Sequence, residues 1–166
     1  MNLIVSVDEN WGIGKDGDLL CRISADMKMF RATTTGHILV LGRKTLESFP
    51  NQKPLPNRTH FVLTTNPNYA AEGVTLCHNL EELQQKLQPY ASEDIFVIGG
   101  GSVYKQLLPF CQKAYVTKIY QHFPADTFFP NLDHLPAWKK TKSGEIQQEN
   151  GVPFSFDVYE RIEKEV

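Results

Sequence analysis

The feature that most constrains the fold of this chain is a series of short apolar runs separated by turn residues and helical segments. The runs are rich in β-branched residues, a composition typical of strands whose two faces are both buried. They are LIVSV (3–7), HILVLG (37–42), HFVLTT (60–65), DIFVIGG (94–100) and AYVTKIY (114–120). Because strands and helices alternate, the pattern predicts an α/β fold with a mostly parallel central sheet.

Two longer helices are expected between these strands. One begins at Ser24, which we expect to be its N-cap, and ends at about Thr35. The other is NLEELQQKLQ (79–88), where Asn79 is the expected cap and Glu82 follows three residues later. Both have the spacing of amphipathic helices that cover a sheet.

Shorter elements complete the predicted fold. Short helices are expected after Gly42 and after Gly101. The segment PFSFDVYERI (153–162) alternates apolar and polar residues and is predicted to be an antiparallel edge strand paired with AWKKTKSGEI (137–146). The prediction is therefore one α/β domain over residues 1–166. It has a mostly parallel sheet of about eight strands, an antiparallel C-terminal edge strand and about four flanking helices.

Composition and charge exclude several classes of function. The 166 residues are 41% hydrophobic and 22% charged with a net charge of −2, which predicts neither a nucleic-acid nor a membrane partner. Three cysteines without a CxxC pair or a secretion signal predict free thiols in a cytoplasmic protein. No cysteine or histidine spacing suits a metal, and a monomer is the default expectation. The histidines expected at the surface or at a strand edge are His37, His60, His78, His122 and His134.

The segment Gly12-Ile-Gly14-Lys-Asp-Gly17 matches the dinucleotide fingerprint GxGxxG, but its context does not. The fingerprint needs a helix that opens at its third glycine and an acidic residue near the end of the second strand. Here the expected helix begins at Ser24, and the second strand ends in Arg43. We therefore interpret the segment as a mobile lid, with a plain surface turn as the alternative.

Two other loops have the character of phosphate-binding sites. The loop GRKT (42–45) follows a strand and opens a helix, so its backbone N–H groups and the Arg43 guanidinium suit a phosphate, including the 2′-phosphate of NADP. The loop GGG (99–101) allows a pyrophosphate to approach the backbone closely. Together they favour one dinucleotide. The alternative for the first loop is two solvated cations on a turn.

A carboxylate lies beside the apolar face of the first predicted helix. Within ISADMKMF (23–30), Ile23, Met27 and Phe30 share one face at helical spacing, and Asp26 borders that face. One interpretation is an acid that stabilises the helix N-terminus by about 0.3–1 kcal/mol. The other is an acid that serves a pocket, and the two are compatible.

Seven stretches of the chain carry a family resemblance by their residues, order and spacing. They are VDENWGIGKDGDL, ADMKMFRATT, LGRKTLESFP, PLPNRTHFVLT, VIGGGSVYKQLLP, VTKIY and ADTFFP. The chain thereby resembles the dihydrofolate reductase family, in its bacterial form, along nearly its whole length. The resemblance implies that NADPH reduces 7,8-dihydrofolate to 5,6,7,8-tetrahydrofolate by hydride transfer to pterin C6 with protonation at N5. It also implies that antifolate inhibitors bind.

The resemblance implies a role at the substrate for each matching residue. Asp26 would bind the pterin N3 and 2-amino groups as the catalytic acid, and Thr117 would hydrogen-bond to Asp26. Arg58 would pair with the α-carboxylate of the folate tail. The implied substrate-binding set is Ile4, Val5, Leu19, Cys21, Asp26, Met27, Phe30, Phe49, Leu55, Arg58, Ile98, Tyr104 and Thr117.

The resemblance also implies a binding site for NADPH and no metal. Thr64 and Thr65 would help to hold the 2′-phosphate, and Asp126 would brace the closed lid. The implied cofactor-binding set is Ser6, Ile13, Gly14, Gly17, Asp18, Gly42, Arg43, Lys44, Thr45, Leu63, Thr64, Thr65, Gly99, Gly100, Gly101, Ser102, Val103 and Tyr104.

The chain departs from the family pattern at three positions. Cys21 stands where the family usually has a tryptophan, Ser24 where it has a second proline, and Ser102 where some members have an arginine. Two other functions compete. A reductase of a riboflavin precursor on the same fold would keep the NADPH loops without the pair of Asp26 and Arg58. A non-catalytic domain would bind folate or NADPH without turning it over.

Overall fold

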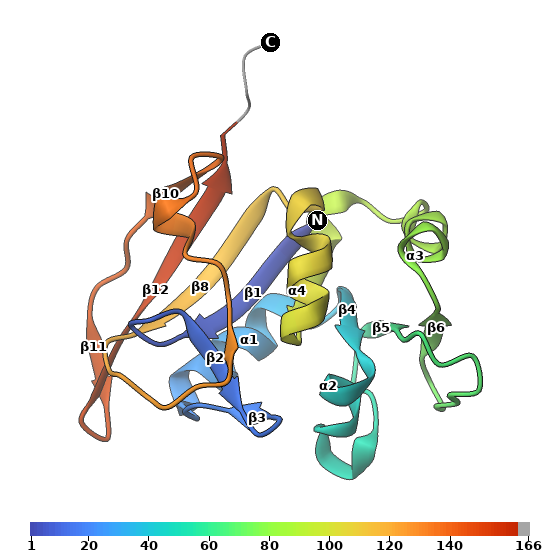
Figure 1. Ribbon diagram of the computed structural model, residues 1–166, viewed down its shortest axis with the longest axis horizontal. Coiled ribbons are helices and arrows are strands. Elements are labelled where there is room, and N and C mark those ends of the chain that lie inside the picture. Colours follow the sequence, from blue (N-terminus) through green and yellow to red (C-terminus); the bar gives the residue numbers. More distant parts are fainter. Residues whose placement is uncertain (163–166) are drawn as a thin grey trace.

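A nine-stranded sheet forms the centre of the molecule (Figure 1). The computed structural model describes residues 1–162, and residues 163–166, the last four of the predicted domain, lie outside the described residues. The strands of this sheet are β1 (Asn2–Val7), β4 (Ile38–Gly42), β5 (Thr59–Leu63), β6 (Thr75–Cys77), β7 (Ile95–Gly99), β8 (Lys113–Ile119), β10 (Trp138–Lys142), β11 (Gln147–Glu149) and β12 (Val152–Arg161). Their order is β10-β12-β8-β1-β7-β4-β5-β6, with β11 paired to β12.

The pairing confirms a mostly parallel sheet. The strands from β8 to β6 run parallel to their neighbours, whereas β12 is antiparallel to β8, β10 and β11. The five apolar runs form β1, β4, β5, β7 and β8. The C-terminal strand β12 is antiparallel and pairs with β10, as predicted. However, β10 occupies the edge, because β12 bonds to a strand on each side.

Helices cover both faces of this sheet. They are α1 (Ser24–Thr34), α2 (Arg43–Glu47), α3 (Leu80–Leu87) and α4 (Gly101–Leu107), with 3-10 turns η1 (Pro50–Gln52), η2 (Ser92–Asp94), η3 (Leu108–Phe110) and η4 (Leu132–His134). In Figure 1, α4 lies in front of the sheet and α1 behind it. The predicted cap of α3 is confirmed, because the Asn79 side chain accepts a hydrogen bond from the Glu82 N–H at 2.8 Å. In the described residues, no helix has the length and apolar character needed to cross a membrane.

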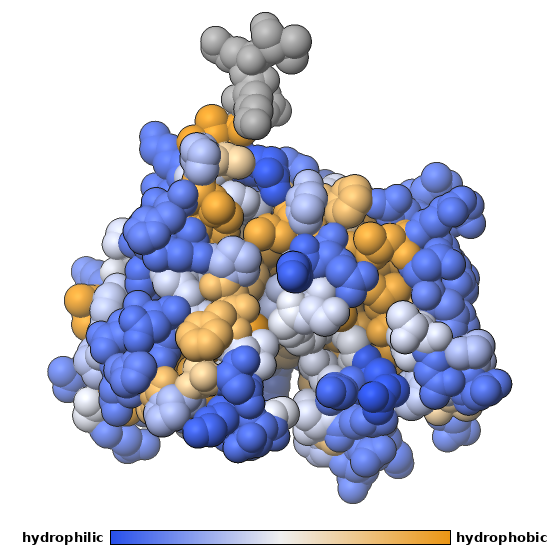
Figure 2. All heavy atoms as spheres, viewed as in Figure 1, coloured by the Kyte–Doolittle hydropathy of each residue, from blue (hydrophilic) through white to orange (hydrophobic). Residues whose placement is uncertain are grey.

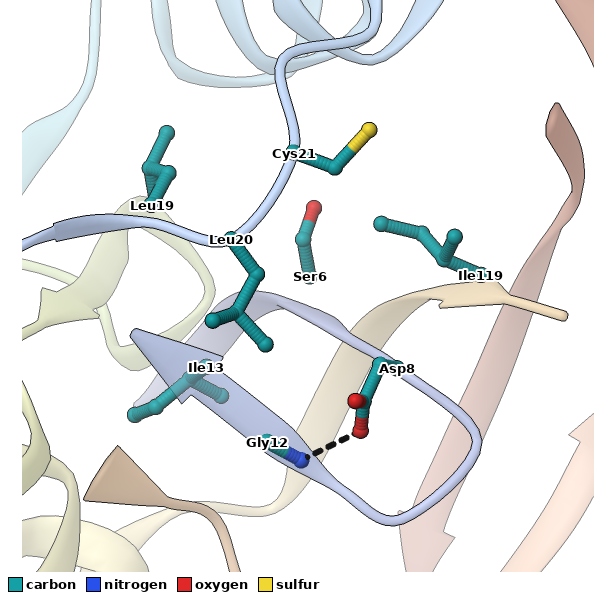
Figure 3. A pocket seen from close by; sticks show the side chains of 8 residues that line it. All are labelled: Ser6, Asp8, Gly12, Ile13, Leu19, Leu20, Cys21 and Ile119. Atoms are coloured by element: carbon teal, nitrogen blue, oxygen red, sulfur yellow. Dashed lines mark hydrogen bonds between the residues drawn. The ribbon is translucent and has the colours of Figure 1, made fainter. Parts of the chain in front are cut away.

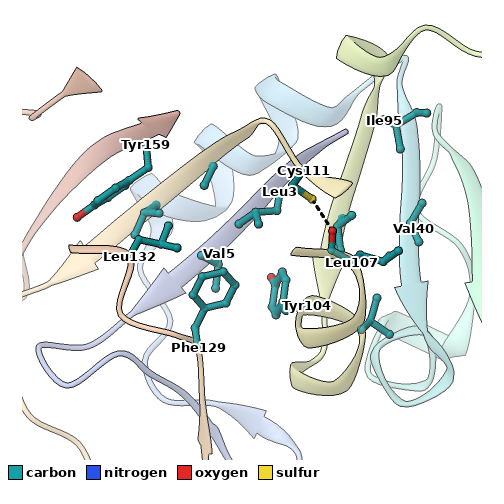
Figure 4. Close-up of a cluster of buried hydrophobic side chains, with 14 of the residues drawn as sticks. Leu3, Val5, Val40, Ile95, Tyr104, Leu107, Cys111, Phe129, Leu132 and Tyr159 are labelled. Atoms are coloured by element: carbon teal, nitrogen blue, oxygen red, sulfur yellow. Dashed lines mark hydrogen bonds between the residues drawn. The ribbon is translucent and has the colours of Figure 1, made fainter. Parts of the chain in front are cut away.

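Alternation along β1 and β8 divides their side chains between the two faces of the sheet. Leu3 and Val5 lie in the main hydrophobic core with side chains of α4 (Figure 4). Since successive side chains of a strand point to opposite faces, Ser6 points to the other face. On β8, Val116 belongs to the main core and Thr117 therefore shares the face of Ser6. Two hydroxyls are thus placed on one face of neighbouring strands.

A second, smaller sheet lies next to the carboxyl ends of the central strands. It consists of β2 (Gly12–Lys15), β3 (Asp18–Leu19) and β9 (Thr127–Phe128), all antiparallel. The GxGxxG segment therefore forms a hairpin and opens no helix, which agrees with rejecting it as a dinucleotide fingerprint. Figure 2 shows the molecule hollowed at its lower edge, between this hairpin and the α2 region. In α/β sheets, ligands bind at this edge, beyond the carboxyl ends of the strands.

Candidate active site

The Asp26 carboxylate is held by two hydroxyls from the central sheet. Asp26 lies in the first turn of α1 and is partly buried. Ser6 on β1 donates to its Oδ2 at 2.6 Å, and Thr117 on β8 donates to its Oδ1 at 2.5 Å. Ser6 and Thr117 are register partners in the parallel β1–β8 pair, so both hydroxyls reach the same carboxylate. Each carboxylate oxygen accepts one internal hydrogen bond and keeps lone pairs for a ligand.

The contact of Thr117 with Asp26 is the one that the resemblance implies, but the contact of Ser6 was missed. We predicted Ser6 at the nicotinamide site, and the structure places its hydroxyl on Asp26. A signal for this contact exists in the sequence, because Ser6 and Thr117 are hydroxyl residues inside mostly apolar runs that we predicted to be buried strands. A buried hydroxyl needs a hydrogen-bond partner. Using that signal requires knowing that β1 and β8 are neighbours.

The resemblance also implies that Phe49 and Leu55 wall the slot for the aminobenzoate part of folate and that Ile98 lies at the pterin, and these three side chains share one face of the sheet. Phe49, Leu55 and Ile98 pack against the hydrophobic cluster that contains Leu39 and Leu41. Val40, between those two leucines, belongs to the main core on the opposite face. Phe49 and Leu55, the two implied walls, therefore lie on the face of the sheet opposite the main core.

Arg58 lies three residues after Leu55, and its side chain is held by two hydrogen bonds. Its Nε donates to the Pro56 carbonyl at 3.0 Å, and its Nη1 donates to Thr34 Oγ1, at the C-terminal end of α1, at 3.2 Å. Burial lowers the pKa of Arg58, and the neighbouring positive charge of Arg31 lowers it further. Partial desolvation strengthens the interaction of a guanidinium with an incoming carboxylate. His60, expected at the surface or at a strand edge, is instead 1% exposed, directly below this loop.

Two of the three glycines in the loop after β7, Gly99 and Gly101, leave little room for a side chain. Gly99 has a φ of 122°, and a Cβ there would lie 3.2 Å from the Tyr104 ring. A Cβ at Gly101 would lie 2.6 Å from Thr127 Cγ2. Tyr104 is buried and donates its hydroxyl to the Ile4 carbonyl at 2.6 Å, which ties α4 to β1. Burial raises the pKa of Tyr104, so this residue remains a neutral donor.

Arg43 is the first residue of α2. Its guanidinium, which we predicted to bind a 2′-phosphate, is paired with the carboxylate of Glu47. Its Nη1 donates to both carboxylate oxygens of Glu47 at 2.9 and 3.0 Å, and its guanidinium lies 6.0 Å from the Tyr69 ring. Sequence analysis missed Glu47, although an acid four residues after an arginine on a helix is a common pairing. Thr64 is buried and Thr65 is exposed just beyond β5.

The β2–β3 hairpin is fixed at its base and braced by Asp126. Asp8 Oδ1 accepts from the Gly12 N–H at 2.8 Å, and Asp8 Oδ2 accepts from the Phe123 N–H at 3.1 Å. The Asp126 carboxylate accepts from the Asp16 N–H at 2.9 Å, which lowers the pKa of Asp126. These contacts fix the base and the tip of the hairpin that we interpreted as a lid. Sequence analysis missed Asp8, which is 1% exposed.

Comparisons with known proteins show the family of the chain. A family model described as dihydrofolate reductase matches residues 1–161. Two relatives named dihydrofolate reductase, from Staphylococcus haemolyticus and Drosophila melanogaster, are 37% and 38% identical. The alignments cover 98% and 96% of this chain and 96% and 97% of the relatives. The chain belongs to the dihydrofolate reductase family. A solved dihydrofolate reductase from Enterococcus faecalis, complexed with NADP(H) and RAB-propyl, is 39% identical and has a TM-score of 0.85 over 98% of this chain and 96% of its own.

Ser24, where the dihydrofolate reductase family usually has a proline, does not cap α1. The N-cap is Ile23, which offers no side-chain hydrogen bond, so the prediction of a Ser24 cap is wrong. Instead, Glu149 on β11 accepts from the Ser24 N–H at 2.6 Å and from the Ala25 N–H at 3.2 Å. A proline has no N–H, so this contact depends on the departure from the family pattern. Glu149 caps the helix that carries Asp26, and sequence analysis missed it.

Cys21, where the dihydrofolate reductase family usually has a tryptophan, lies beside Ser6 at a cavity of about 10 Å³, the size of one water molecule (Figure 3). Leu20 and Ile119 also line this cavity. Burial raises the pKa of the Cys21 thiol, and the negative charges of Glu149 and Asp26 raise it further. We therefore expect the thiol to react slowly.

Several of the substrate- and cofactor-binding residues that the resemblance implies take no part in the hydrogen bonds described above. Leu19 and Met27 are each 55% exposed and leave apolar surface available to a ligand, whereas the side chains of Val5 and Val103 lie in the main core. Asp18 is exposed and pairs with Arg22 at 3.0 Å. Within residues 1–162, no group of three or more His, Cys, Asp or Glu residues is arranged to hold a metal ion.

Proposed function

We propose that this chain reduces 7,8-dihydrofolate to 5,6,7,8-tetrahydrofolate with NADPH, the reaction for which its family is named. The observation that carries the proposal is the Asp26 carboxylate, oriented by Ser6 and Thr117 at the ligand-binding edge of the sheet. The solved relative that contains NADP(H) supports the cofactor. The glycine loop at 99–101, where a side chain at Gly99 or Gly101 would crowd Tyr104 or Thr127, suits a close approach of its pyrophosphate to the backbone.

Asp26 acts on the pterin ring. Its carboxylate accepts from the pterin N3–H and 2-amino group with the lone pairs that Ser6 and Thr117 leave available. Holding the ring in this way polarises it toward protonation at N5, and the proton arrives through water. When bound, NADPH supplies the hydride to C6. Asp26 is the only carboxylate in the substrate-binding set, and general-acid assistance is worth about 10²–10⁴-fold in rate.

Arg58 binds the other end of the substrate. Its Nε and Nη1 are engaged by Pro56 and Thr34, and its Nη2 makes no hydrogen bond within residues 1–162. An arginine pairs with a carboxylate as a fork, and these internal contacts hold its plane in one orientation. Phe49 and Leu55, which pack against one hydrophobic cluster, would wall the slot between the two ends. The lid, braced by Asp126, excludes water from the reacting atoms.

The decisive experiment is a turnover assay with purified protein, NADPH and dihydrofolate, followed at the nicotinamide absorbance band. We expect NADPH oxidation that depends on dihydrofolate and is inhibited by an antifolate. Oxidation with a deaminated riboflavin precursor but not with dihydrofolate would support the competing reductase. Binding of both ligands without oxidation would support the non-catalytic alternative.

We also propose that residues 1–166 act as one monomeric, cytoplasmic unit that binds neither nucleic acid nor membranes. The three cysteines are free thiols, which suits a reducing compartment. The net charge of −2 gives no electrostatic attraction for polyanions. Sedimentation of the protein at several concentrations tests the monomer.

A further inference from the structure

His60 is a buried histidine whose two ring nitrogens are both hydrogen-bonded to one loop. The residue lies on β5 and is 1% exposed. Its Nε2 lies 3.0 Å from the Leu55 backbone nitrogen, and its Nδ1 lies 3.2 Å from the Arg58 carbonyl oxygen. The ring also packs edge-on against Phe49, with the centroids 6.2 Å apart. All three neighbours belong to the proposed substrate site.

These contacts define the protonation state of the ring. A backbone N–H can only donate, so Nε2 must be the unprotonated acceptor for Leu55. A carbonyl can only accept, so Nδ1 must carry the proton that is donated to Arg58. The partners therefore assign a neutral imidazole with its proton on Nδ1. Protonation of Nε2 would place two donors against each other and break the contact with Leu55.

The loop between η1 and β5 depends on this ring for its shape. Leu55 lies between Pro54 and Pro56, which have no N–H groups, so the Leu55 N–H is the loop donor available at this point. The His60 ring bridges that donor to the Arg58 carbonyl, and so joins the start of the loop to its end. Arg58 would bind the substrate tail, and Leu55 would wall its slot. The His60 side chain sets the position of these two residues relative to each other.

We propose that neutral His60 is a positioning residue for the carboxylate tail of the substrate, and that protonation of His60 loosens the Leu55–Arg58 loop and weakens binding of that tail. The proposal rests on the proposed role of Arg58. It adds a specificity determinant that acts on tail-bearing ligands and leaves binding of the pterin ring at Asp26 unaffected.

The electrostatic surroundings of His60 agree with this geometry. Burial lowers its pKa, and the positive charge of Arg58 lowers it further, while its hydrogen bond to the Arg58 carbonyl acts in the opposite direction. The charged groups that face this region are Arg58 on the same loop and Arg31 on α1, which lies near Arg58. A base with a lowered pKa in the folded protein keeps its neutral contacts above its ordinary pKa of about 6.5. Those contacts are lost as the pH falls through the lowered value.

The test compares two ligands that share a pterin ring, folate and 6-methylpterin, which lacks the tail. The ratio of their dissociation constants isolates the tail, and the α-carboxylate of folate stays ionised between pH 5 and pH 7.5 because its pKa is about 3.5. The variants are His60→Leu, which removes both hydrogen bonds, and His60→Gln, which keeps a neutral acceptor that does not titrate. NADPH affinity is the control for folding.

At pH 7.5 we expect His60→Leu to weaken folate about three- to tenfold, the size of one lost neutral hydrogen bond, with less than about twofold change for 6-methylpterin. As the pH falls from 7.5 through the lowered pKa of His60, folate binding should weaken in the wild type and stay level in His60→Gln. Equal weakening of both ligands by His60→Leu, or the same pH profile in the wild type and His60→Gln, would overturn the proposal.

Two measurements keep the test independent of variant folding and of the proposed function. The nitrogen NMR shifts of the wild-type His60 ring, assigned with His60→Gln, should show a protonated Nδ1 and a bare Nε2 at neutral pH. A proton on Nε2 would overturn the proposal. If Arg58→Leu leaves the ratio of folate to 6-methylpterin affinity unchanged, the proposed role of Arg58 is wrong. If Arg58→Leu changes that ratio and His60→Leu does not, only the inference about His60 is wrong.

Discussion

The pterin end and the tail end of the proposed substrate site are each held in place by hydrogen bonds. These bonds join residues at very different separations along the chain. Asp26 accepts from Ser6 and Thr117, which lie 20 and 91 residues away along the chain. The helix that carries Asp26 is capped by Glu149, which lies 125 residues from Ser24. The pterin end therefore depends on the register of the whole sheet.

The tail end is held mostly by contacts within one loop. Arg58 bonds to Pro56 and His60 bonds to Leu55, at separations of two and five residues, and one bond reaches Thr34, 24 residues away. A loop that is organised by its own neighbours can change shape without disturbing the sheet. We therefore expect changes at the pterin end to affect chemistry and stability, and changes at the tail end to affect affinity for one class of ligand.

The largest expected effect is at the centre of the pterin end. Asp26→Asn should lower turnover at pH 7 by about 10²–10⁴-fold, because the acid that polarises the pterin is lost. Part of the activity should return as the pH falls and solvent protonates the substrate directly. NADPH binding, as the control, should not change. Turnover near the wild-type rate at pH 7 would mean that Asp26 is only a helix-start residue.

A smaller effect is expected at the tail end. Arg58→Lys replaces a bidentate fork by a single ammonium and should weaken dihydrofolate by roughly tenfold or more, the size of a lost hydrogen bond to a charged group. A pterin without the glutamate tail should bind almost as well as to the wild type. Arg31→Lys, at an exposed neighbouring position, is the matched control. Similar losses for both ligands would contradict the assignment of Arg58 and remove the contrast between the two ends.

The contribution of Glu149 to the pterin end can be measured, because its cap on α1 should raise the free energy of unfolding. Glu149→Gln should lower the free energy of unfolding by about 0.5–2 kcal/mol, because a charged acceptor is lost from two N–H groups at the start of α1. Glu145→Gln, at an exposed position four residues earlier, should change it by less than about 0.5 kcal/mol. Chemical denaturation of both variants gives the comparison. Equal stabilities would show that β11 does not support α1.

The smallest expected effect is on the reactivity of Cys21, at the junction of lid and helix. A small thiol reagent should label it slowly, because its pKa is raised, and bound folate should slow labelling further. Glu149→Gln removes one negative charge that raises this pKa, so it should speed labelling about two- to threefold. Peptide mass spectrometry separates Cys21 from the buried Cys77 and Cys111. Labelling at one rate with the site full or empty would place Cys21 outside the substrate site.

Features that depend on neighbouring residues could be predicted from the sequence. The apolar runs form β1, β4, β5, β7 and β8, because a buried strand is recognisable from its own composition. The Asn79 cap and the absence of a helix at Gly17 follow from local spacing in the same way. The placement of Asp26 next to Thr117 came from the family resemblance, and the structure agrees.

Features that depend on which strands are neighbours were decided by the tertiary structure. Ser6 meets Asp26 only because β1 and β8 pair in parallel with Ser6 opposite Thr117. Glu149 replaces the expected Ser24 cap because β11 lies against the start of α1. His60 is buried under the loop that carries Leu55 and Arg58, although a lone histidine in a strand sequence has no mark of burial. A hydrogen bond needs its partners within about 3 Å, and residues far apart in the chain meet this condition only through the packing of the whole fold.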